Sequence, residues 1–310
     1  MKESRFLCAK AVRLRETQKG PIMDARFHPA QTALERGDVE GLALLLKADP
    51  ELATARSGCS HPTLLQCLVL TMPPVDILET LIDLLADLGA DLNDPLVAAC
   101  SVDNFRAAVK LLDRGAAIDG DGRWSPLEEA LYWGHDGCVR LLLERGANVA
   151  NLRTAAALGD MEKVARCFDA NGALTTAAGV IASPFFRTLI PDPIRSDPTQ
   201  IINNALVYAA AWGRCEVVDF LMDHGGRINM IPAGFDYAGT PLHYAALNGR
   251  KEMVDHLLRR HNADPTVRDT KIGNLSEGWA RHAGHEELAE SLRRVRLRAE
   301  AFNAAQEFSV

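Results

Sequence analysis

The sequence lacks the short patterns by which many catalytic and metal-binding sites are recognised. It contains no Gly-x-Ser-x-Gly elbow, no His-Glu-x-x-His, no glycine-rich phosphate loop and no Cys-x-x-Cys pair. These absences favour a binding protein over an enzyme. They also predict that the chain has no resident metal ion and no cofactor.

Long apolar runs are missing as well. No stretch approaches the roughly 18 residues that a membrane helix needs, and lysine and arginine interrupt residues 1–20 too often for a signal peptide. The net charge of −7 disfavours nucleic acid and anionic membranes as partners. The seven cysteines are odd in number and widely spaced, as expected of reduced thiols in a cytoplasmic protein.

Two stretches of the chain share one plan. Residues 240–261 read TPLHYAALNGRKEMVDHLLRRH, and residues 125–146 read SPLEEALYWGHDGCVRLLLERG. Each begins with a threonine or serine that can cap a helix, followed by a proline suited to the first helical position. A glycine then ends the first helix, a leucine-rich second helix follows, and Gly146 is expected to adopt a left-handed conformation.

The same plan recurs along the chain. Turn glycines are predicted at Gly37, Gly134, Gly159, Gly213, Gly249 and Gly284. Second helices are predicted at 42–47, 78–88, 107–114, 139–145, 217–224 and 253–260. After the second helix at 253–260, Asn262 stands where other units have a glycine, and asparagine tolerates a positive φ.

Residues 240–243, Thr-Pro-Leu-His, together with Ala245, Ala246 and Gly249, resemble the ankyrin-repeat consensus. The resemblance implies an all-α solenoid of about seven to eight helix–turn–helix units, with some short β-hairpin fingers and one irregular insert. It also implies that His243 ties the preceding loop to the helix start through hydrogen bonds. The run from 197 to 284 is similar to a group of bacterial ankyrin proteins.

The repeat spacing is uneven. Gly89 and Gly115 are 26 residues apart, as are Gly146 and Gly172, so the fingers of these units are expected to be absent. In contrast, residues 227–239 predict an unusually long finger.

The predicted organisation has three parts. Residues 1–26 form an N-terminal basic helix or tail, residues 27–295 the ankyrin-repeat domain, and residues 296–310 a C-terminal tail. An insert at 174–196, which carries Phe185 and Phe186, separates the fifth unit from the sixth. Because long inserts are often functional, we expect a lid over the neighbouring repeats, with a flexible loop as the alternative.

After the insert, aspartate, proline and glutamine at 197, 198 and 200 predict a helix that starts there and runs to Trp212.

Tryptophan and tyrosine are scarce, with four of each, and none lies in the first three units. In the ankyrin pattern, three positions of the first helix face a concave groove, and most of these aromatics occupy such positions in the later units. Large aromatic side chains with a polar tip are typical of binding hot spots, although they also pack against one another without a binding role. The candidate binding residues are Tyr132, Trp133, Tyr208, Trp212, Tyr237, Tyr244, Asn248, Trp279 and His282.

We therefore expect a cytoplasmic module whose groove binds a protein or peptide partner. The alternative is an enzyme or small-ligand receptor, with a pocket between the aromatics and the 174–196 insert and with Glu129, Asp236, Arg281 or His282 as polar groups.

Two other groups of polar residues are assigned structural roles. His282, His285 and Glu286 are divided by the turn glycine of their unit, so they predict no metal site. Glu128 occupies the consensus histidine position, and its neighbour Glu129 is expected to be solvated.

Overall fold

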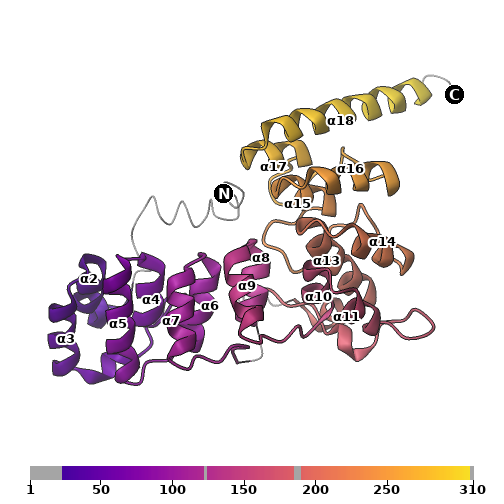
Figure 1. Cartoon of the computed structure of the whole chain (residues 1–310). Helices are drawn as coiled ribbons and strands as arrows, with labels where there is room; N and C mark the ends of the chain where they lie inside the picture. Colours follow the sequence, from indigo (N-terminus) through magenta and orange to yellow (C-terminus); the bar gives the residue numbers. More distant parts are fainter. Residues whose placement is uncertain (1–22, 122–123, 185–189, 308–310) are drawn as a thin grey trace. The chain divides into compact units, whose positions relative to one another are not determined.

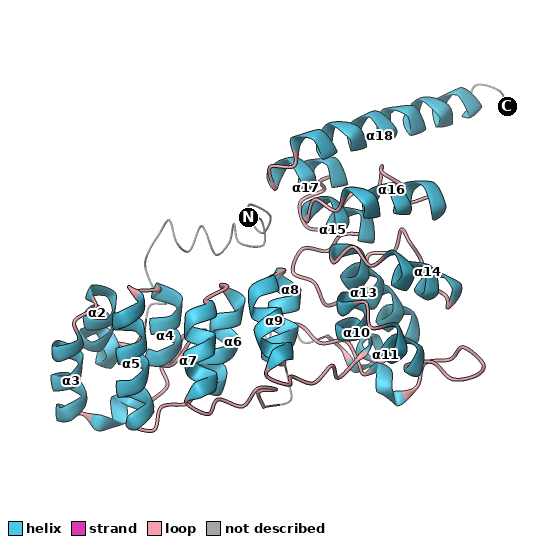
Figure 2. Cartoon of the chain, in the orientation of Figure 1, coloured by secondary structure: helices cyan, strands magenta, loops and turns pink. Residues whose placement is uncertain are grey.

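The computed structural model describes residues 23–121, 124–184 and 190–307. These residues fold into two compact units that meet in the sequence between Asn148 and Val149, and each is considered by itself. The part of the chain that is described is helical and forms no strand (Figure 2). None of its helices is both long enough and apolar enough to cross a membrane.

The N-terminal unit, residues 23–148, consists of helices joined in pairs by tight turns (Figure 1). The pairs are α2 (His28–Arg36) with α3 (Val39–Ala48), α4 (Leu64–Thr71) with α5 (Val75–Asp87), α6 (Asn93–Ser101) with α7 (Phe105–Asp113), and α8 (Pro126–Trp133) with α9 (Asp136–Glu144). Short 3-10 turns lie at Ala25–Phe27 and Pro50–Ala53.

The C-terminal unit, residues 149–307, repeats the pairing. Its helices are α10 (Leu152–Leu158), α11 (Met161–Arg166), α12 (Asp192–Arg195), α13 (Pro198–Ala211), α14 (Cys215–Asp223), α15 (Pro241–Leu247), α16 (Lys251–Arg260), α17 (Ser276–His282) and α18 (Glu286–Glu307), with a 3-10 turn at Thr176–Ala178. The first helices α10, α13, α15 and α17 pack in succession.

Local capping explains where the first helices begin. Ser125 accepts a hydrogen bond from the amide of Glu128, whose carboxylate in turn accepts from the amide of Ser125. Thr240 and His243 form the corresponding reciprocal pair at α15. Such pairs satisfy amides that the first turn of a helix leaves without partners, so the predicted helix starts are confirmed.

Backbone conformation explains where helices end. Gly146 has φ +90°, and Asn262, which replaces a glycine, has φ +52°. Both lie in the left-handed region, as predicted for residues that follow the last turn of a helix. Helix α13 is likewise capped by Asp197 and ends at Trp212, as the sequence predicts.

Each unit has a core of leucine, isoleucine, valine and alanine between its two layers of helices. In the C-terminal unit Leu206 and Ala209 of α13 are fully buried together with Val218 and Leu221 of α14. The second helices bury only one side, because they form the outer layer of the stack.

The predicted β-hairpin fingers are not confirmed. Among the described residues only isolated bridges occur, between Phe168 and Leu174 and between Arg268 and Leu275. The long segment 227–239 follows turns instead, because side chains of α13 bind its backbone. Asn203 accepts from the amide of Arg227 (2.8 Å), Gln200 accepts from the amide of Ala233 (2.9 Å), and Asn204 donates to the carbonyl of Ala233 (2.9 Å).

The structure also bears on the two predicted ends of the chain. Helix α18 continues without a break from Glu286 to Glu307, through the boundary predicted at residue 295. Arg296 joins it to α17 through an ion pair with Glu277 at 3.0 Å. Residues 1–22 of the predicted N-terminal helix or tail lie outside the described residues.

The flanks of the 174–196 insert are part of the core. Ala178 and Ile181 are buried, and the amide of Ile181 donates to the carbonyl of Arg195 in α12. A side-chain nitrogen of Arg153 in α10 donates to the carbonyl of Val180 at 2.7 Å. Phe185 and Phe186 lie outside the described residues, so the lid stays a prediction.

Candidate functional site

A row of aromatic side chains runs across three successive repeats of the C-terminal unit. It links Tyr208 of α13 to Phe235 (ring centroids 5.3 Å apart), Phe235 to Tyr244 of α15 (4.9 Å), and Tyr244 to Trp279 of α17 (5.2 Å). Tyr237 meets Trp279 edge to face at 6.2 Å. These five residues are called the aromatic row.

Most of the aromatic row is buried. Tyr208, Tyr244 and Trp279 each keep about 5% of their surface exposed. Phe235 of the long 227–239 segment packs between Tyr208 and Tyr244, and Trp279 packs against Tyr237 and Tyr244. Tyr237 is 36% exposed. The sequence identified four of these five aromatics as candidate binding residues, but it did not identify Phe235, which fills the space between two of them.

The polar groups of Tyr244 and Trp279 hold the neighbouring loops in place through hydrogen bonds. The hydroxyl of Tyr244 donates to the carbonyl of Tyr237, and the indole nitrogen of Trp279 donates to Asp269 at 3.0 Å. Asp269 also accepts from the amides of Lys271, Ile272 and Asn274. Burial alone would raise the pKa of Asp269, but these hydrogen bonds outweigh it and lower the pKa, so the carboxylate stays charged.

Beside the row, two loop tips form a ridge of four residues, called the finger ridge. Tyr237, Lys271 and Ile272 are exposed, and Asp236 is half-buried. The amide of Thr270 donates to the carbonyl of Ala238, which joins the two loops. The ammonium of Lys271 lies 4.3 Å from the ring centre of Tyr237 and 2.7 Å from Asp236. Ile272 is 66% exposed, an unusual position for an isoleucine side chain.

The other candidates in the C-terminal unit lie at the ends of first helices. Trp212 follows α13 and is buried, and Asn248 follows α15 and donates to the carbonyl of Tyr244. His282 is exposed in the last turn of α17. Arg281, named for the alternative pocket, is also exposed on α17 and pairs with Glu286 at 3.6 Å.

The two candidates in the N-terminal unit belong to a second cluster. Tyr132 meets Trp133 edge to face at 5.2 Å and Trp124 at 6.2 Å. Tyr132 is buried and Trp133 is half-buried.

Glu129 lies beside these rings, and its predicted solvation is wrong. Its side chain is buried, and it accepts hydrogen bonds from the indole nitrogens of Trp124 and Trp133, the latter at 2.7 Å. Burial raises the pKa of Glu129 to about 7, although the two indole bonds act in the opposite direction. The expectation failed because it treated the two faces of α8 as core and solvent, whereas the Trp124 loop covers the second face.

His243 has the structural role expected of it. Its Nδ1 lies 2.8 Å from the Thr240 hydroxyl, and its Nε2 faces the carbonyl of Asn274 at 3.3 Å. Burial lowers its pKa, which favours the neutral ring that this arrangement needs. The ring of His285 lies against Gly249 of the preceding repeat.

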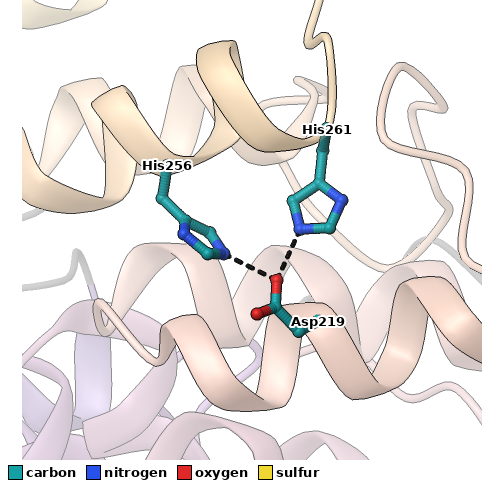
Figure 3. A group of neighbouring side chains, drawn as sticks. All are labelled: Asp219, His256 and His261. Carbon is teal, nitrogen blue, oxygen red and sulfur yellow. Dashed lines mark hydrogen bonds and ion pairs between the residues drawn. The ribbon is translucent and has the colours of Figure 1, made fainter.

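A cluster that sequence reasoning missed lies on the second helices. Asp219 of α14 is approached by His256 of α16 and by His261 just beyond it (Figure 3). The sequence holds one signal for it. When residues 217–226 are aligned with 253–262, Asp219 and His256 differ by one position, which places them side by side in consecutive repeats.

Comparison with known proteins agrees with this architecture. The family model for ankyrin repeats in three copies matches residues 74–152 and 170–269, more than half of the chain. The chain is also similar to the ankyrin repeat and KH domain-containing protein mask-1 of Caenorhabditis elegans, with 26% identity over 280 residues. That match covers 84% of this chain but only 10% of the relative's length. Ankyrin repeats generally mediate protein–protein interaction. The chain belongs to the ankyrin-repeat family.

Proposed function

We propose that this chain is a cytoplasmic binding module whose C-terminal unit recognises a protein or peptide partner through the finger ridge. The observation that carries the proposal is the exposure of Tyr237 and Ile272 on adjoining loops, which hydrogen bonds with the buried residues Tyr244 and Asp269 hold in place. All cysteines of the described residues are free, which fits a reducing compartment.

The aromatic row gives the ridge its rigidity. Tyr244 and Trp279 are too buried to offer much area to a partner, but each holds one loop through its polar tip. Binding by a surface that is already ordered costs little conformational entropy. In this proposal Tyr208, Tyr244 and Trp279 therefore position the surface, while Tyr237 contacts the partner.

The chemistry of the ridge indicates the kind of partner. Ile272 and the ring of Tyr237 offer apolar contacts, and Asp236 and Lys271 flank them with one charge of each sign. This combination suits an extended segment with an apolar anchor residue beside polar or charged groups. His282 on α17 and Asn248 after α15 extend the proposed surface along the ends of the first helices.

Affinity capture from cell extract tests the proposal. The wild-type chain is compared with Tyr237→Ala and Ile272→Ala, and Leu44→Ala serves as the control, because Leu44 is 69% exposed on α3 of the other unit. A hot-spot residue contributes about 2 kcal/mol or more to binding, so the first two variants should lose most of the captured protein. The control should retain it.

Two outcomes would contradict the proposal. Unchanged capture by both ridge variants would remove the ridge from the binding surface. Recovery of a metabolite instead of a protein, lost in Tyr237→Ala, would favour the small-ligand alternative.

A further inference from the structure

The cluster of Asp219, His256 and His261 has the geometry of a shared ligand set. The Nε2 atoms of both histidines lie 2.7 Å from the same carboxylate oxygen of Asp219 (Figure 3). The two rings approach each other edge to face, with centroids 5.2 Å apart. One donor atom from each residue therefore falls within 4.8 Å of the other two.

Two imidazoles and a carboxylate are the donor set that zinc and similar divalent ions prefer. Zinc bonds of about 2.0–2.2 Å in a tetrahedral arrangement place the ligand atoms about 3.3 Å apart. The present nitrogen-to-oxygen distances of 2.7 Å need to widen by only a fraction of an ångström. Neutral histidine can move its proton to Nδ1, which frees Nε2 as a ligand.

The surroundings permit an ion to enter. The side chains of His256, His261 and Asp219 are 19%, 11% and 28% exposed, so the donors are partly desolvated but remain within reach of solvent. Three protein ligands leave a fourth tetrahedral position for water or for a group on another molecule.

The charged side chain of Arg260 competes for the carboxylate of Asp219. The Nε of Arg260 donates to the shared oxygen of Asp219 at 2.9 Å. Because the Arg260 side chain is 63% exposed, it can turn into solvent when a divalent ion replaces its charge. Arg260 thus offers a direct way to tune the affinity of the site without touching a ligand.

We propose that Asp219, His256 and His261 form a binding site for a zinc-class divalent ion that links α14 to α16. The ion would clamp the second helices of two consecutive repeats together, on residues separate from the finger ridge. Since the ligand set comes together only in the folded chain, ion binding would stabilise the folded C-terminal unit.

Titration of the chelator-treated full chain with Zn²⁺ and Co²⁺ tests the proposal. We expect saturable binding of one ion per chain and a melting temperature that rises with added Zn²⁺. Bound Co²⁺ should show visible absorption bands that are typical of a low-symmetry coordination. Asp219→Asn and His256→Gln should each weaken binding at least about tenfold and abolish the thermal shift. Arg260→Gln should tighten binding.

Two control variants separate this site from other ligands. His28→Gln removes an exposed histidine of the other unit and should leave binding unchanged. Cys215→Ser removes the thiol one turn before Asp219 and should leave both the affinity and the Co²⁺ spectrum unchanged, because the proposed ligands contain no sulfur. Circular dichroism of each variant checks that the helices are retained.

Absence of saturable binding by the wild-type chain would overturn the proposal. Equal affinity in the wild type, Asp219→Asn and His256→Gln would also overturn it, since the ion would then bind elsewhere. The proposal would also be wrong if Cys215→Ser lost ion binding and the Co²⁺-loaded wild type showed a sulfur-to-cobalt charge-transfer band, because the ion would then have a different ligand set.

Discussion

Glu129 should make the stability of the N-terminal unit depend on pH in an uncommon direction. Most carboxylates in folded proteins have a lowered pKa and lose stabilisation in acid. Burial raises the pKa of Glu129 from 4.5 to about 7, so its folded form binds a proton more tightly than its unfolded form does. Its contribution to stability is therefore fully present below about pH 4.5 and is lost as the pH rises through 7.

The size of the effect follows from the difference between the two pKa values. Each pKa unit corresponds to about 1.4 kcal/mol, so the change from 4.5 to about 7 corresponds to about 3 kcal/mol. The side chain is buried, so solvent screening removes little of this amount. The two indole donors, Trp124 and Trp133, already oppose the shift, and weakening either would raise the pKa further.

Glu129→Gln isolates the contribution of this one group. The amide does not titrate, and its NH2 group replaces one of the two oxygens that accept separately from Trp124 and Trp133. Near pH 4.5, where Glu129 is protonated in the folded wild type, we expect the variant to be less stable by about 1–3 kcal/mol, because one buried indole donor loses its partner. Denaturant unfolding between about pH 4 and pH 8 then gives the difference in the free energy of unfolding between wild type and variant at each pH.

The wild type should lose about 3 kcal/mol of stability relative to the variant from pH 4.5 to above pH 7, so that the two proteins become equally stable or their order reverses. Other titrating groups are common to both proteins and cancel. Parallel stability profiles for the two proteins across this range would refute the reasoning. So would a Glu129 carboxyl carbon that titrates near pH 4 in an NMR experiment.

Two further substitutions test the repeat framework. Gly146→Val should lower the free energy of unfolding by about 1–3 kcal/mol through backbone strain, since its φ is +90° and a Cβ there meets no atom within 4 Å. Gly146→Asn, which tolerates this conformation better, should lose less, and equal losses would contradict the strain argument. His243→Ala should cost about 1–3 kcal/mol, because Thr240 and the carbonyl of Asn274 both lose a buried partner. A His243→Ala protein with an unchanged melting temperature but impaired partner binding would show that the residue contacts the partner instead.

The helices of the fold could be predicted because their signals are local. Ser125 and Pro126 start α8 through a capping pair that spans three residues, Gly134 ends this helix in the left-handed conformation, and Asn262 adopts the same conformation just after α16. The role of His243 was also accessible, because it depends on the neighbouring Thr240.

The long segment 227–239 shows where such reasoning stops. Its length suggested a finger with its own hairpin bonds, but Gln200, Asn203 and Asn204 of α13 bind its backbone instead. Side chains 24 to 33 residues away compete with the local pattern, and a repeat consensus does not contain them.

The candidate site could likewise be predicted only in part. The consensus indicated which first-helix positions face away from the stack, and Tyr208, Tyr244 and Trp279 lie together as neighbours of one row. It did not indicate that Phe235 would pack between Tyr208 and Tyr244. The cluster around Asp219 was missed because its members belong to the second helices of different repeats and meet only when these stack.

The irregular loops of the C-terminal unit are held in place by hydrogen bonds with buried polar side chains, which matters for the proposed binding surface. A β-hairpin finger would form its own backbone hydrogen bonds and could move as a whole. Here Asp269 binds three loop amides and the indole of Trp279, while Asn203 and Asn204 bind the long segment from below. Loosening either loop would leave buried polar groups without partners, at about 1–3 kcal/mol for each. In the proposed function, the finger ridge is therefore already ordered in the free protein, and the binding energy of a partner would not be spent on ordering it.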